Sequence, residues 1–175
     1  MSSKRSSLSK RVKALTLSAM MASLSVVILY LGSIIEVLDL CTALIASIMC
    51  TFVVIEVGGG WPYLTYAVTS VLSLLLLPNK FIAVVYFLFA GIYPILKEKI
   101  ERLSSKILKW AIKIAFFCLI ITTVFLISEF ILAVPMDINV WVYLLGTPVF
   151  VLYDVALTRL ITAYVFRYKK MLKIK

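Results

Sequence analysis

Three carboxylic acids stand inside long apolar stretches of this sequence, where an ionised group has few partners. Asp154 lies near the middle of the run 141–166, Glu129 lies toward the end of the run 110–134, and Glu56 closes another run. A carboxylate at the centre of a bilayer costs about 3 kcal/mol and usually faces a cavity or a partner. Two interpretations of Asp154 stay open, a polar clamp between helices and a group that contacts a ligand.

The residue types needed for catalysis or for metal binding are largely missing. The chain has no histidine, and Cys41, Cys50 and Cys118 follow neither a zinc spacing nor a disulfide framework. Without histidine, the commonest general base and the commonest transition-metal ligand are absent. No nucleophile and base stand at a spacing typical of a catalytic pair, and the three acids inside the apolar runs are far apart in sequence. We therefore expect no enzyme, no metal site and no cofactor, and we interpret the cysteines as packing residues.

Composition indicates an integral membrane protein. The 175 residues are 63% hydrophobic and only 15% charged, too apolar for one small water-soluble core. The net charge is +10, but the basic residues flank apolar stretches instead of forming a face with interleaved aromatic residues. We expect them to contact anionic lipid headgroups and not nucleic acid. All of them except Lys80 form three clusters: Lys4, Arg5, Lys10, Arg11 and Lys13; Lys97, Lys99, Arg102, Lys106, Lys109 and Lys113; and Arg159, Arg167, Lys169, Lys170, Lys173 and Lys175.

Hydropathy divides the chain into six apolar segments. The run 61–96 is too long for one crossing, because as a single helix it would extend about 54 Å against a hydrocarbon core of about 30 Å. Pro78-Asn79-Lys80 supplies a turn near its middle. We predict one all-α integral membrane domain over residues 1–175. Its six transmembrane helices span approximately 14–35, 40–57, 61–77, 80–96, 110–134 and 141–166.

The basic clusters predict the orientation of these helices. Short loops rich in Lys and Arg stay in the cytoplasm. Four predicted helices separate the first two clusters and two separate the last two, so even counts place all three clusters on one side. Both termini are therefore expected in the cytoplasm, together with the stretch 97–109. That stretch is either an amphipathic helix on the headgroup surface or an extension of the fourth helix.

A stripe of small residues follows one side of the first predicted helix. Ala14, Ser18 and Ala22 recur at intervals of four. Small residues let two helices approach closely in lipid, where dispersion packing drives association. The stripe is suited either to packing within the chain or to docking on a separate subunit.

The whole-chain pattern resembles the substrate-binding S component of energy-coupling factor (ECF) transporters. The features that carry the resemblance are the basic start KRVKALTLSAMMASLSVV, apolar helices joined by short loops, and the ending FVLYDVALTRLITAYVFRYKK. Members of that family are six-helix proteins of bacterial plasma membranes with cytoplasmic termini. The resemblance implies capture of a vitamin-like or other small nutrient. Transport would be energised by a transmembrane coupling subunit and two cytoplasmic ATPases.

The resemblance also implies where the sites lie. The stripe Ala14, Ser18 and Ala22 matches the docking surface for the coupling subunit, with Ser in place of one Ala. Acids and aromatics at the outer end would suit a small polar or cationic organic ligand. The ligand would lie against the first external loop and helices four to six, and the candidate lining is Glu36, Asp39, Tyr86, Glu129 and Asp154.

A non-catalytic membrane scaffold, similar to the rod-shape protein MreD, is the alternative. MreD is comparable in size and number of spans. A scaffold needs helix surfaces for protein partners but no ligand pocket. A dry interior around Asp154 would favour this alternative.

Overall fold

A computed structural model describes residues 2–130 and 140–169, and all regular structure in these ranges is helical. The prediction of an all-α protein is confirmed for this part of the chain. The elements are α1 (Ser2–Ile34), η1 (Glu36–Leu38), α2 (Asp39–Glu56), α3 (Trp61–Leu76), α4 (Lys80–Val85), η2 (Tyr86–Ala90), α5 (Tyr93–Glu101), α6 (Lys106–Phe130), α7 (Val140–Tyr164) and η3 (Val165–Lys169).

Five helical segments are long and apolar enough to cross a membrane. The sixth apolar segment, α3, has 16 residues and is therefore about 24 Å long, shorter than a hydrocarbon core of about 30 Å. The end of the predicted fifth helix, 131–134, lies outside the described residues. The five long segments are Leu8–Ile34, Asp39–Glu56, Lys80–Glu101, Lys106–Ile127 and Tyr143–Arg167.

Local sequence signals explain where α3 begins and ends. Gly58 and Gly59 adopt φ angles of 65° and 62°, a left-handed conformation that glycine adopts without steric cost, and they turn the chain between α2 and α3. At the other end of α3, the ammonium group of Lys80 donates to the carbonyl oxygens of Leu74 and Leu77 at 2.9 and 2.8 Å. The Asn79 side chain then caps α4.

The segment from α4 to α5 is helical but irregular. η2 is a π-helical stretch in its middle, and Gly91 follows it. A Cβ atom on Gly91 would lie 2.7 Å from the Tyr66 ring and 2.9 Å from the Tyr86 ring, so only glycine fits between them. The helix continues to Glu101, and α6 begins at Lys106 after a short turn. The first part of the basic stretch 97–109 is thus an extension of the fourth predicted helix.

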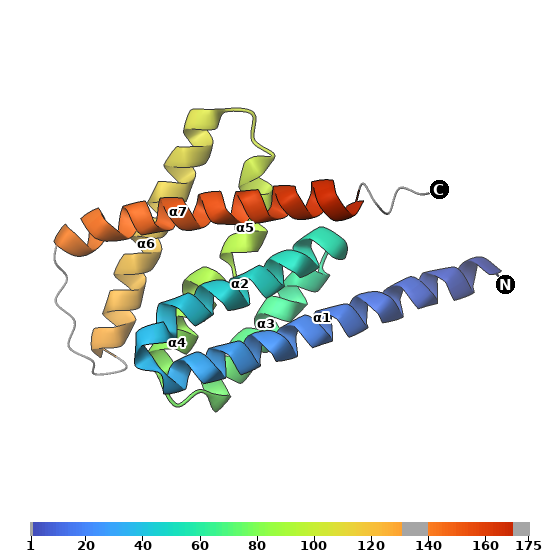
Figure 1. Cartoon of the computed structure of the whole chain (residues 1–175), viewed down its shortest axis with the longest axis horizontal. Helices are drawn as coiled ribbons and strands as arrows, with labels where there is room; N and C mark the ends of the chain where they lie inside the picture. Colours follow the sequence, from blue (N-terminus) through green and yellow to red (C-terminus); the bar gives the residue numbers. More distant parts are fainter. Residues whose placement is uncertain (1, 131–139, 170–175) are drawn as a thin grey trace.

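The helices α1, α2 and α3 form one group, and α5, α6 and α7 form a second group that packs against it (Figure 1). α1 lies along α2 and α3, and its first turns project beyond the bundle. α7 crosses α5 and α6, and ion pairs between these helices show that they touch at the crossing. The beginning of α1, the turn between α2 and α3, and the end of α7 lie at one end of the molecule.

Candidate functional site

Asp154 lies where α7 crosses α5 and α6, and donors surround its carboxylate. One oxygen accepts from the Tyr93 hydroxyl at 2.5 Å and from the Lys97 ammonium group. The other oxygen accepts from the ammonium group of Lys113 at 2.9 Å. Lys113 also donates to Glu101 at 2.7 Å. We call Lys97, Glu101, Lys113 and Asp154 the charge network.

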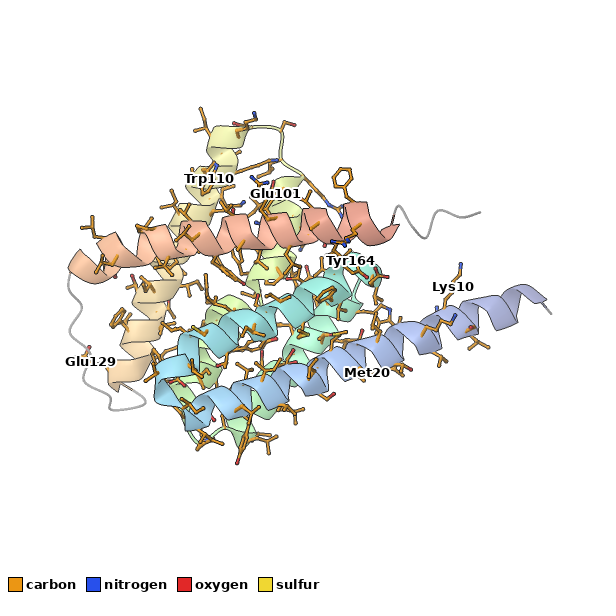
Figure 2. The ribbon with its side chains drawn as sticks, in the orientation of Figure 1. Lys10, Met20, Glu101, Trp110, Glu129 and Tyr164 are labelled. Carbon is orange, nitrogen blue, oxygen red and sulfur yellow. The ribbon has the colours of Figure 1, made fainter. Side chains whose placement is uncertain are left out.

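The charge network is largely withdrawn from solvent, and a further cation, Lys109, lies 3.4 Å from its member Glu101. It contains two cations and two carboxylates, and Lys97, Lys113 and Asp154 are each less than 5% exposed. Glu101 is the exposed member, and it lies at the end of α5 (Figure 2). Lys97 has further acceptors in the backbone carbonyl of Asp154 at 2.9 Å and the Thr158 hydroxyl at 2.8 Å. Every charge therefore has a partner of opposite sign, which a buried ion needs.

The geometry favours a clamp over a ligand contact for Asp154. Its two oxygens already accept hydrogen bonds from three side chains, which come from α5 and α6. Lys97 lies one turn before the end of α5 and Lys113 two turns after the start of α6. The charge network therefore holds three helices together close to the turn that joins α5 and α6.

Sequence reasoning missed the partners of Asp154. It assigned Lys97 and Lys113 to a basic cluster that was expected to contact anionic lipid headgroups, whereas the structure buries both of them. One signal was present, because Lys113 stands within the apolar sequence KWAIKIAFF and Asp154 stands within another apolar run. Two opposite charges in separate apolar helices are each costly alone and are expected to pair.

The other predicted ligand residues lie in different surroundings. Asp39 accepts a hydrogen bond from the Asn79 side chain at 2.8 Å and so links the start of α2 to the turn before α4. Tyr86 is fully buried in η2, and among the described residues its hydroxyl has no hydrogen-bond partner. Glu129 is exposed near the end of α6, far from Trp110 near the start of that helix (Figure 2). The side chain of Glu36 lies outside the described residues.

The small-residue stripe of α1 faces the rest of the chain. Ser18 and Ala22 are buried and Ala14 is half-buried, and α1 packs on α2 and α3. The opposite face presents apolar side chains such as Met20, which points away from the bundle (Figure 2). The stripe thus packs within the chain in this structure.

An apolar cavity of about 430 Å³ lies between α2, α4, η2, α6 and α7. Leu40, Leu145 and Val149 stand at its exposed edge. None of Asp39, Tyr86, Glu129 and Asp154 is on its lining. This cavity is therefore lined by other residues than the four predicted ligand residues whose side chains the structure describes.

Aromatic rings form the inner end of the cavity. Phe117 and Phe150 are stacked with centroids 4.8 Å apart, and Phe89 lies 5.8 Å from Phe150. Tyr153 completes this end, and its hydroxyl lies 2.5 Å from the Ser47 hydroxyl. A Cβ atom on Gly146 would approach the Phe117 ring to 3.1 Å, so the glycine leaves room for this ring.

The cavity and the charge network are neighbours because they share consecutive residues of α7. Tyr153 lines the cavity, and Asp154 belongs to the charge network. The Tyr93 ring lies 5.6 Å from the Tyr153 ring, while its hydroxyl donates to Asp154. Among the described residues, no three His, Cys, Asp or Glu side chains are grouped to hold a metal ion.

Comparisons with protein-family models, with curated proteins and with solved structures find no match to this chain. The arrangement of the cavity and the charge network is therefore the basis for a functional proposal.

Proposed function

We propose that this chain is a membrane-embedded binding subunit that takes up a small nutrient molecule, with energy supplied by partner proteins. The observation that carries the proposal is the apolar cavity between α2, α4, η2, α6 and α7. Its volume of about 430 Å³ lies in the range of about 300–1,000 Å³ that is typical of small-molecule sites. Such sites commonly lie between the helices of a bundle.

The charge network supports this proposal by making the inner end of the cavity rigid. It holds α5, α6 and α7 at one crossing, next to the aromatic rings. A pocket whose walls are held in place binds with a smaller loss of conformational entropy. A ligand can enter or leave at the exposed edge of the cavity, whereas release past the inner end requires these helices to move, which suits a subunit driven by external energy.

The remaining parts of the proposal follow from the sequence. Six crossings with both termini in the cytoplasm of a bacterial plasma membrane agree with the basic clusters. Gly58-Gly59-Gly60 is not followed by the Lys-Ser or Lys-Thr of a phosphate-binding loop, so the chain lacks this motif for binding nucleotides. A transmembrane coupling subunit and two cytoplasmic ATPases are the proposed energy source.

Purification of the full chain from native membranes in mild detergent tests the proposal. Mass spectrometry would identify the small molecules and proteins that purify with it. The variant V149W places a large ring at the cavity edge, and L152W is the matched control because Leu152 is exposed on the same helix but not on the lining. We expect a small molecule with the wild type and L152W, and its loss with V149W.

A scaffold is the second candidate, and the saturated hydrogen bonding of Asp154 favours it. A scaffold needs a rigid interior, and the three donors to this carboxylate provide one. Recovery of cell-wall or division proteins, with no small molecule and no ATPases, would support the scaffold and refute the uptake function.

A further inference from the structure

We propose that the molecule bound in the cavity is uncharged and contains a flat, largely apolar ring system. This inference rests on the proposed function and specifies its substrate class. It departs from the polar or cationic ligand that the acids in the sequence suggested.

The composition of the cavity wall disfavours a charged group inside the cavity. Of the described residues on the lining, only Tyr153 carries a polar side-chain atom, and its hydroxyl already has the Ser47 hydroxyl at 2.5 Å. A charged group inside this wall would lose its hydration without gaining a partner, which is strongly unfavourable. An uncharged apolar molecule gains from the same loss of water.

The nearby charge network does not change this conclusion. Lys97 and Lys113 are held by Asp154 and Glu101, so neither lysine is left to neutralise a ligand anion. Asp154 is likewise held by two ammonium groups and by the Tyr93 hydroxyl. A ligand ion would have to break one of these pairs, and a buried ion without its partner is costly.

The shape of the inner end favours a flat ring. Phe89, Phe117, Phe150 and Tyr153 lie there with neighbouring centroids 4.8–6.2 Å apart. Rings at these separations interact by offset stacking or by edge-to-face contact, and a ligand ring can add to such a cluster. The hydrocarbon chain of a lipid would gain burial but not these ring contacts.

A pair of probes with the same shape tests the charge discrimination. The full chain in phosphatidylcholine nanodiscs would be dialysed to equilibrium with 2-naphthamide or with 2-naphthoate, which differ by one charge. Empty nanodiscs correct for partition into lipid, V149W removes the site, and L152W is the matched control. We expect saturable binding of 2-naphthamide to the wild type and L152W but not to V149W. Binding of 2-naphthoate should be weaker by at least about tenfold, which corresponds to about 1.4 kcal/mol.

Two outcomes separate the failure of this inference from the failure of the proposed function. If 2-naphthoate binds as tightly as 2-naphthamide and V149W abolishes both, the inference is wrong and the uptake function stands. If neither naphthalene probe binds while hexadecanol binds saturably, the cavity holds acyl chains, and both proposals are wrong.

Discussion

Replacement of Asp154 by asparagine removes the charge that holds two buried lysines while keeping the size of the side chain. Lys97 would retain the backbone carbonyl of residue 154 and the Thr158 hydroxyl, but no carboxylate in contact. Lys113 would retain Glu101 at 2.7 Å. The main effect is therefore an unpaired ammonium group at Lys97, a residue that is only 3% exposed.

The magnitude follows from the burial of this pair. Removing one partner of a buried ion pair costs about 3–5 kcal/mol, because the remaining charge stays desolvated. Because Lys97 keeps two polar acceptors, the cost for D154N should lie at the lower end of this range. We therefore expect the free energy of unfolding to fall by about 3 kcal/mol. E98Q is the matched control, since the Glu98–Arg102 pair is exposed and contributes less than about 1 kcal/mol.

Unfolding by dodecyl sulfate in mixed micelles, followed by tryptophan fluorescence, measures these differences. The double variant K97M/D154N distinguishes an ion pair from simple packing. It removes the unpaired ammonium group and leaves Lys113 with Glu101, so we expect it to regain at least about 1.5 kcal/mol relative to D154N. A free energy of D154N within about 0.5 kcal/mol of the wild type would refute the reasoning, as would a further loss on adding K97M.

The remaining predictions concern helix packing and topology. G32A should lower the free energy of unfolding by about 1–3 kcal/mol, because the new Cβ would clash with the Thr42 side chain. The control variant G60A should show no loss in the same titration, because nothing lies within 4 Å of a Cβ atom at residue 60. An equal effect of both variants would contradict the close approach of α1 and α2. In a cysteine-free background, a membrane-impermeant maleimide added to intact cells should label P78C and spare S105C, and labelling of S105C would reject the proposed orientation.

Hydropathy and turn residues predicted the helical segments because these are local properties of the chain. The glycines at 58–60 and the Pro78 turn lie where the sequence predicts breaks between helices. The bounds of α3 agree with the prediction as well, since the helix covers Trp61–Leu76 and the predicted segment is 61–77. Hydropathy and turn residues therefore predict where the helices lie in the sequence and that the composition is that of a membrane protein. They do not predict how the helices cross.

The candidate site depended on contacts between distant parts of the chain. Lys97 and Lys113 have the same side chain as the lysines of the exposed clusters, and only the rotation of α5 and α6 turns them toward Asp154. The cavity is lined by aliphatic and aromatic residues whose types are those of an ordinary helix interface. A site prediction based on acids therefore selected other residues.

The sequence by itself determined that this is a helical protein with the composition of a membrane protein and short connections between apolar segments. A long apolar run requires lipid or protein around it whatever its neighbours are, so these properties need no tertiary information. Only the tertiary structure decided that Asp154 is paired and that an aromatic cavity lies beside it. Both depend on where α7 crosses α5 and α6, and residues far apart in the sequence set that crossing together.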